Sequence, residues 1–267
     1  MSLKIQLITK YNKCLKAMNR LNEIQSRIST LTRLALCFTI ITMATIGPAA
    51  ADDCVILLHG MARTPASMDK MGEMLGEEGF QVVNLGYPSR KKTIAELAPL
   101  AVDEGLDACP ESTEKVHFVT HSLGGILVRY YLDSNEIKNL GRVVMLAPPN
   151  QGSQVVDAYR DLPGYDALNG PAGQQLGTDE ESVPLNLPPV EFDLGVIAGT
   201  RTINPILSLE LPNPDDGKVS VENTKVEGMN DFLETPHSHP LIMKSSDVIE
   251  QVTYYLNNGH FNHVEKK

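Results

Sequence analysis

Residues 116–129 read VHFVTHSLGGILVR, and this stretch decides the fold. A short, β-prone apolar run at 116–120 meets the sequence HSLGG at 121–125 and passes into an amphipathic helical run without a linker. The pattern predicts a strand, a one-residue corner and a helix, with the hydroxyl of Ser122 exposed above a sheet. The helix N-terminus behind that corner presents unpaired backbone N–H groups to an incoming anion. Ser122 is therefore the candidate nucleophile.

The usual form of this corner is Gly-x-Ser-x-Gly, because the strand and helix backbones nearly touch there. Thr120 stands where the first glycine is expected, while Gly124 keeps the second. Threonine suits the end of a strand but weakens the motif. An ordinary helix N-cap serine is the alternative interpretation of Ser122.

Strand and helix patterns alternate along the chain around this corner. Short apolar runs predict strands, and 3.6-residue spacing predicts helices at 65–78, 94–106 and 245–256. The alternation predicts an α/β fold, a mostly parallel, doubly wound sheet with helices on both faces and ligands at the carboxyl ends of its strands. The predicted strands are 55–58, 80–85, 116–120, 142–146, 194–198 and 229–234.

Residues 151–190 lack clear periodicity and are rich in proline and glycine. A segment of this length inside a compact domain is typical of a functional cap or lid. A plain surface excursion is the alternative.

The first fifty residues differ from the rest. The uncharged apolar run at 34–46 follows Arg33 and precedes Gly-Pro and three alanines at 49–51, which is the pattern of a secretory signal peptide. We therefore expect residues 1–51 to be a signal peptide and 52–267 to be one catalytic domain, secreted or periplasmic. An uncleaved anchor is the alternative for 1–51, and Met18 is an alternative start.

Charge and cysteines agree with an exported protein. The chain carries a formal net charge of −10, and residues 1–51 hold seven Lys or Arg and one Glu, which leaves −16 on residues 52–267. This balance argues against binding to nucleic acid. Cys54 and Cys109 each precede a predicted buried strand, so we expect a disulfide between them if those strands are neighbours; two free thiols are the alternative.

A serine nucleophile needs a base, and the base needs an acid, in the chain order Ser, acid, His on this kind of fold. His237 and His239 follow the last predicted strand, and Asp215 and Asp216 lie in a turn upstream of them. Asp216 directly precedes glycine. An ordinary Asp-Gly turn and a His-x-His metal site are the alternatives.

The negative tetrahedral intermediate needs backbone donors, typically the residue after the nucleophile and one in the loop after an early strand. Leu123 and Met61 fit these two positions of an oxyanion hole. Gly60 would let the Met61 loop approach closely.

Six motifs together resemble the α/β-hydrolase fold lipases and esterases, in the secreted bacterial lipase-like branch. They span nearly all of residues 52–267 and read VILLHGMARTPASMDKM (55–71), YPSR (87–90), THSLGG (120–125), APPNQGS (147–153), DDGKVSVENT (215–224) and HSHPLIM (237–243). The resemblance implies a triad of Ser122, Asp216 and His239, with His239 preferred to His237. Thr120 for glycine is a departure.

The resemblance implies a serine hydrolase that cleaves carboxylic esters through an acyl-enzyme and acts on a small-molecule ester or lipid. No cofactor and no catalytic metal are expected, and a structural calcium ion is an open alternative. A transient lipid interface and a monomer are expected. An acyltransferase or thioesterase with the same triad, and a catalytically silent relative that binds a lipid or partner, are the alternatives. The absence of Trp and the polar character of 151–190 argue against long-chain lipase activity.

Overall fold

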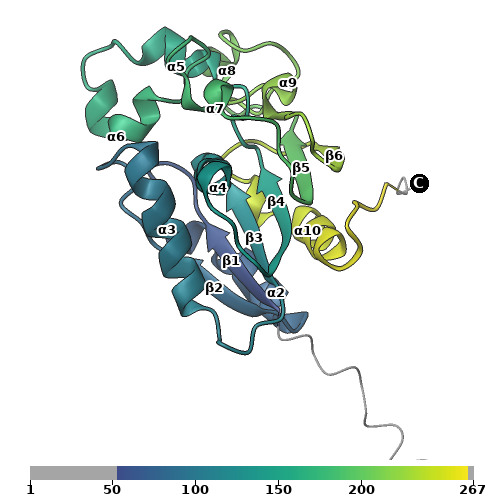
Figure 1. Cartoon of the computed structure of the whole chain (residues 1–267). Helices are drawn as coiled ribbons and strands as arrows, with labels where there is room; N and C mark the ends of the chain where they lie inside the picture. The colour runs from purple at the N-terminus through teal and green to yellow at the C-terminus, as the bar shows by residue number, and fades with distance from the viewer. Residues whose placement is uncertain (1–52, 264–267) are drawn as a thin grey trace, which may run out of the picture. The chain divides into compact units, whose positions relative to one another are not determined.

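The computed structural model describes residues 53–263. Its centre is a sheet of six parallel strands in the order β2-β1-β3-β4-β5-β6 (Figure 1). The predicted parallel sheet is confirmed, with strand ends that shift by one or two residues. The strands are β1 (Cys54–Leu58), β2 (Gln81–Leu85), β3 (Val116–His121), β4 (Leu140–Leu146), β5 (Leu194–Gly199) and β6 (Asp231–Thr235).

Strands β1 and β3 lie side by side inside the sheet and are covered on both faces, as expected for parallel strands. Every residue of β1 and β3 is buried. β3 pairs with β1 on one side and with β4 on the other, so Ser122, which follows β3, lies at the middle of the sheet's carboxyl edge.

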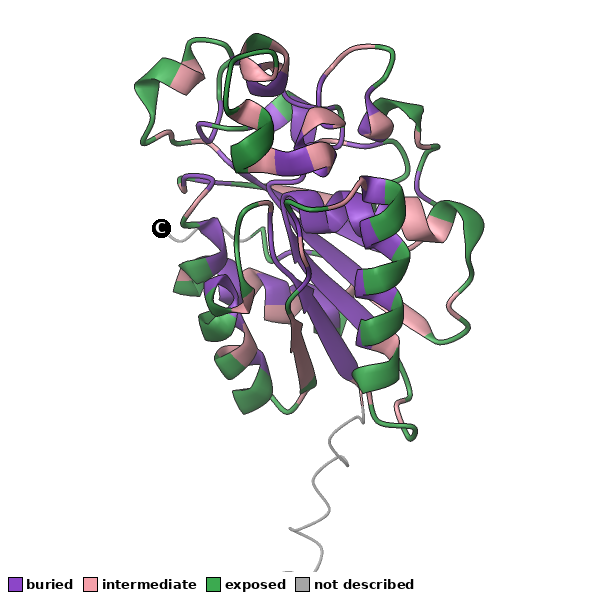
Figure 2. Cartoon of the chain, turned by 90° about the vertical axis from the view of Figure 1, so that its left-hand side faces the viewer, coloured by how far each residue is buried: buried purple, intermediate pink, exposed green. Residues whose placement is uncertain are grey.

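Helices cover both faces of the sheet, as Figure 2 shows from the side, where buried strands lie between helices with exposed outer sides. On one face pack α3 (Ile94–Ala108) and α4 (Leu123–Ser134), through side chains that include Ile94, Leu97 and Ile126. On the other face pack α2 (Asp69–Glu77) and α10 (Ser246–Asn258), through side chains that include Met71 and Val252. Short 3₁₀ turns, η1 (Pro65–Ser67) and η2 (Ile242–Lys244), precede these last two helices.

The segment 151–190 is not a structureless loop. It contains α5 (Gln154–Tyr159), α6 (Tyr165–Gln174) and α7 (Val183–Asn186), which lie over the carboxyl edge of the sheet together with α8 (Pro205–Ser208) and α9 (Val221–Thr224) (Figure 1). These helices are short, and a non-helical Gly170 followed by Pro171 interrupts α6. Apolar periodicity could not reveal them because none continues for more than about three turns.

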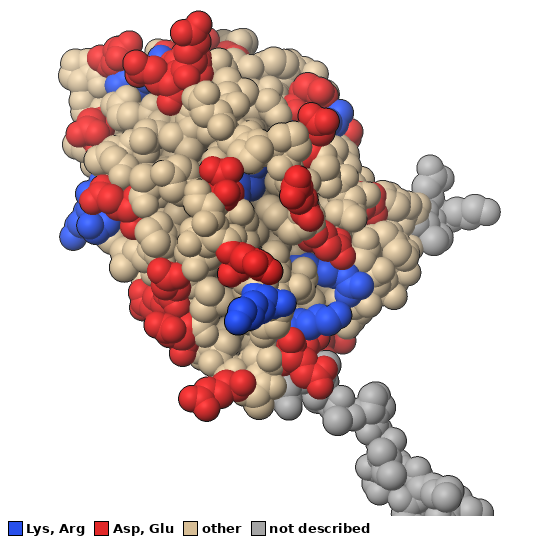
Figure 3. Space-filling view, viewed as in Figure 1, with Lys and Arg blue, Asp and Glu red and all other residues tan. Residues whose placement is uncertain are grey.

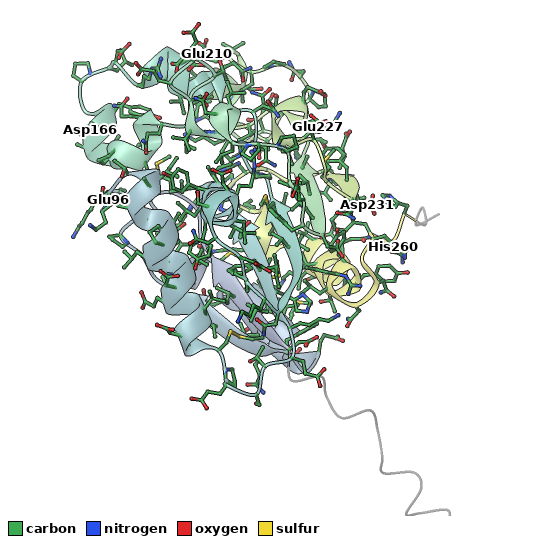
Figure 4. All side chains as sticks on the ribbon, viewed as in Figure 1. Glu96, Asp166, Glu210, Glu227, Asp231 and His260 are labelled. Atoms are coloured by element: carbon green, nitrogen blue, oxygen red, sulfur yellow. A yellow bond between two sulfur atoms is a disulfide. The ribbon has the colours of Figure 1, made fainter. Side chains whose placement is uncertain are left out.

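The predicted disulfide between Cys54 and Cys109 is confirmed, and its sulfur–sulfur bond is drawn in Figure 4. It joins the first residue of β1 to the residue that ends α3, with the two Cα atoms 5.9 Å apart. The bridge therefore lies at the amino edge of the sheet, opposite Ser122.

Within residues 53–263, no helix is long and apolar enough to cross a bilayer. The predicted signal segment, 1–51, lies outside the described residues. Acidic side chains are spread across the face that Figure 3 shows, and basic side chains on that face lie next to them.

Candidate active site

Ser122 occupies a sharp corner between β3 and α4. Its backbone has φ 53° and ψ −120°, a conformation that residues other than glycine rarely adopt. Its backbone N–H donates to the carbonyl of Leu146 (2.9 Å). The helix turns back so closely that a Cβ on Gly124 would lie 2.6 Å from the carbonyl oxygen of Leu58. Only glycine fits at position 124, which explains this part of the motif.

Thr120 fits at the first position of the motif because the helix offers a second glycine. The Thr120 side chain is fully buried, and a Cβ built on Gly125 would lie 3.2 Å from its hydroxyl oxygen. Gly125 therefore leaves space for Met145, whose sulfur would lie 3.0 Å from that Cβ, and for the Thr120 side chain.

Ser122, His239 and Asp216 are brought into one hydrogen-bonded line. The distance from Ser122 Oγ to His239 Nε2 is 3.1 Å, and that from His239 Nδ1 to Asp216 Oδ2 is 2.7 Å. The other Asp216 oxygen accepts the backbone N–H groups of Lys218 (2.9 Å) and Val219 (2.8 Å), and the Asp216 side chain is fully buried. A buried carboxylate held in this way can fix the imidazole tautomer, so that Nε2 is free to take the serine proton.

The alternative residues point elsewhere. His237 contacts Asp247 (Nε2 to Oδ2, 2.9 Å) and the hydroxyl of Ser245 (3.1 Å), so His237 and His239 do not face a common metal position. Asp215 accepts from the hydroxyl of Ser208 (2.6 Å) and from a backbone N–H. Among residues 53–263, no group of three or more His, Cys, Asp or Glu is placed to hold a metal ion.

His121 is a site residue that the sequence analysis missed. Its ring is buried, and Nε2 lies 3.0 Å from the backbone carbonyl of His239, which requires the proton on Nε2. Burial holds the pKa of His121 well below its usual range, with a smaller contribution from the neighbouring His239. Neutral His121 thus anchors the loop that carries His239. A histidine directly before the nucleophile at a strand end is the sequence signal for this anchoring role. The signal can be interpreted only when the position of the His239 loop is known.

The two predicted oxyanion donors face the same corner. Leu123 is the first residue of α4, whose first N–H groups have no partner within the helix. Met61 lines the same cavity as Ser122, and in the described chain neither backbone N–H has a hydrogen-bond acceptor. Both are free to donate to a bound ligand.

The Met61 loop is held on both sides. The ring of His59 stacks on Tyr87 with ring centres 4.2 Å apart, and the Tyr87 hydroxyl donates to the His59 carbonyl. Beyond Met61, the N–H of Ala62 donates to the hydroxyl of Ser89 (3.1 Å). The YPSR motif therefore supports the loop, which the sequence alone did not indicate.

A cavity of about 130 Å³ opens beside Ser122. The segment 151–190 contributes the apolar side chains of Val155, Val156 and Leu176 to its lining, together with Tyr165 and Asn169 of α6. A cavity of about 150 Å³ lined by apolar side chains holds a benzene-sized group. The space therefore suits a short apolar chain attached to a group at Ser122.

No known family model matches the sequence, and no curated protein matches it at a significant level. Solved structures do resemble the chain. Bacillus licheniformis lipase BlEst2 in its mature form has a TM-score of 0.61 and 18% identity, over 79% of this chain and 94% of that one. Legionella pneumophila phospholipase PlaB has a TM-score of 0.60 and 16% identity, over 78% of this chain and 60% of that one. A metagenomic carboxyl esterase, MGS0156, has a TM-score of 0.60 and 18% identity, over 73% and 67%.

Proposed function

We propose that this chain, which has the α/β-hydrolase fold, is a serine hydrolase that cleaves carboxylic esters through an acyl-enzyme. The observation that carries the proposal is the line from Ser122 Oγ through His239 to the buried Asp216, with distances of 3.1 and 2.7 Å. The solved lipases and esterases that share the fold support the same reaction class.

In the proposed reaction, Ser122 Oγ attacks the ester carbonyl carbon while His239 Nε2 takes the hydroxyl proton. The Asp216 carboxylate stabilises the imidazolium through Nδ1. The backbone N–H groups of Met61 and Leu123 donate to the oxyanion, and one such donor is typically worth about 2.7 to 4 kcal/mol of barrier. His239 then gives its proton to the leaving alcohol, and water repeats the sequence to release the acid.

The size of the cavity argues for short acyl groups. Because it is about 130 Å³ and its apolar wall comes from α5 and Leu176, we expect butyryl esters to be better substrates than palmitoyl esters. The fixed cap side chains, rather than the chemistry at Ser122, then set the chain-length preference.

A fluorophosphonate probe tests the triad directly. The purified protein should be labelled at Ser122, as located by peptide mass spectrometry, and should hydrolyse nitrophenyl butyrate. Labelling should vanish in His239→Ala and persist in His237→Ala, which is the matched control because its ring contacts Asp247 instead. No labelling of folded wild-type protein would refute the proposal.

The disulfide supports an oxidising compartment for the folded domain, because such bonds persist in secreted and periplasmic proteins. We therefore keep the prediction of export, with residues 1–51 as its signal. Mass spectrometry of the protein recovered from an exporting host should show a chain that begins near residue 52. The predicted monomer is checked on the same sample by light scattering.

A further inference from the structure

Two cationic side chains, Arg63 and Lys218, stand at the mouth of the active site. Arg63 lies two residues after Met61 in the loop that follows β1, and Lys218 lies two residues after Asp216. Both line the cavity at Ser122, and both also line a second hollow on the other side of His239. The turns that position the oxyanion loop and the acid therefore also position this pair.

Neither cation is neutralised by a carboxylate of its own. Between residues 53 and 263, four cations pair with acids, namely Lys92, Arg142, Arg160 and Lys225. Arg63 and Lys218 belong to the larger group of described cations that have no acid within ion-pair distance. Asp216 acts on Lys218 through space, but its two oxygens are already occupied by His239 and by backbone N–H groups. The pair thus keeps a positive charge that a ligand can reach, since both residues are exposed.

The charged groups around Lys218 include both Asp216 and Arg63. Loss of hydration lowers the pKa of Lys218, the Asp216 carboxylate opposes that change, and the guanidinium of Arg63 adds to it. A bound anion would relieve the repulsion between the two cations.

The two cations line both hollows, so the direction of the substrate follows from the role of His239 in the reaction. The cavity walled by Val155, Val156 and Leu176 suits the acyl chain. The hollow beyond His239 is lined by Ile203, Leu207 and Pro240 together with the two cations. Asp216 also lines it, with its carboxylate oxygens bonded to His239 and to backbone N–H groups. Because His239 protonates the leaving alcohol, the alcohol portion of an ester belongs on that second side.

We propose that Arg63 and Lys218 form a subsite for an anionic group on the alcohol portion of the substrate, so that the enzyme prefers esters of alcohols bearing a phosphate or carboxylate. This inference rests on the proposed function, and it names the substrate class of the same site. Arg63 supplies a planar fork of donors and Lys218 a compact charge, a combination that suits an oxyanion group.

Three nitrophenyl butyrates test the subsite: one with a carboxylate on the ring, one with a neutral carboxamide and one with a trimethylammonium group. The measured quantity is the ratio of kcat/KM for the anionic ester to that for the neutral one, in wild type and in variants. Intrinsic reactivity of the esters cancels when these ratios are compared between proteins.

We expect Arg63→Gln and Lys218→Gln each to lower this ratio by about 2- to 5-fold, which corresponds to the interaction energy of an exposed ion pair. The double variant should lower the ratio by about 10-fold. The cationic ester should gain relative to the neutral one in the double variant. Lys218→Arg should keep most of the ratio. The control is Lys138→Gln, which removes an exposed cation between α4 and β4, at the opposite edge of the sheet, and should leave the ratio unchanged.

Inhibition of ester hydrolysis by phenyl phosphate and by benzoate shows which anion the subsite prefers. Either inhibitor should bind more weakly to the double variant than to the wild-type protein. The subsite is overturned if the double variant hydrolyses the neutral ester normally and keeps the wild-type ratio, or if neither anion inhibits. This failure differs from failure of the proposed function, in which wild-type protein neither hydrolyses the neutral ester nor accepts the fluorophosphonate.

Discussion

The backbone of Ser122 should make the wild-type protein less stable than a variant without activity. With φ 53° and ψ −120°, Ser122 occupies a region that costs a residue with a Cβ about 1 to 3 kcal/mol, and glycine avoids that cost. Glycine also makes the unfolded chain more flexible than alanine does, which costs about 0.4 to 1 kcal/mol. The difference predicts that Ser122→Gly is more stable than Ser122→Ala by about 0.5 to 2 kcal/mol.

Urea unfolding of the two variants, followed by circular dichroism at pH 7, measures this difference. Both variants lack the hydroxyl, so both should lose ester hydrolysis and labelling. Ser134, the exposed last residue of α4, is the matched control because it is a serine within the helix that follows the corner. There the order should reverse, with glycine less stable than alanine by up to about 1 kcal/mol. Equal stability of Ser122→Gly and Ser122→Ala would show that the corner is not strained.

Four further predictions concern the acid, the bridge, the corner and pH. Asp216→Asn should lower kcat by about 10⁴-fold with little change in circular dichroism, because Asn favours the wrong His239 tautomer; a loss below about tenfold would exclude Asp216 as the acid. The double variant Cys54→Ser/Cys109→Ser, which opens a loop with a sequence separation of 55, should lose about 4 kcal/mol of unfolding free energy in the chain-entropy model, measured by urea unfolding; an unchanged midpoint would contradict this. Gly124→Ala should cost about 1 to 3 kcal/mol in the same assay, since its Cβ would lie 2.6 Å from a backbone carbonyl, and a neutral result would contradict the close approach. Burial lowers the pKa values of His59, His117 and His121 in the folded state, so these side chains take up protons in the unfolded chain at a higher pH than in the folded one. The free energy of unfolding should therefore fall as the pH drops below about 6.5, by up to about 1.4 kcal/mol per pH unit for each histidine. An unfolding free energy that stays constant between pH 7 and 5 would contradict the burial of these rings in their neutral form.

The sequence was most informative where one local rule decides the structure. Buried parallel strands read as continuous apolar runs, and the corner at Ser122 combines a strand end, a nucleophile and a helix start in a few residues. The candidate acids, Asp215 and Asp216, and the candidate bases, His237 and His239, could be proposed because each pair follows a strand that ends at the same edge of the sheet. The resemblance to lipases and esterases then favoured Asp216 and His239. The disulfide could be proposed for the same reason, since Cys54 and Cys109 each precede a strand.

The parts that the sequence did not reveal depend on contacts between distant segments. α5, α6 and α7 are too short for periodicity, and their positions are set by packing over the sheet edge. His121 supports His239 across 118 positions of chain, and Ser89 supports the Met61 loop across 27. Nothing in the sequence distinguishes Arg63 and Lys218 from other charged surface residues. Only the fold brings both of them to the cavity beside Ser122.

The disulfide at the amino edge of the sheet also marks where the chain enters the domain. β1 begins at Cys54, whereas the mouth beside Ser122 opens at the carboxyl edge, about 17 Å away for a five-residue strand. A protein immobilised on a bead or electrode through the segment before β1 would therefore present its mouth away from the support. Such a tether should leave turnover of bulky esters unhindered, whereas attachment through α6, which lines the cavity, should block it.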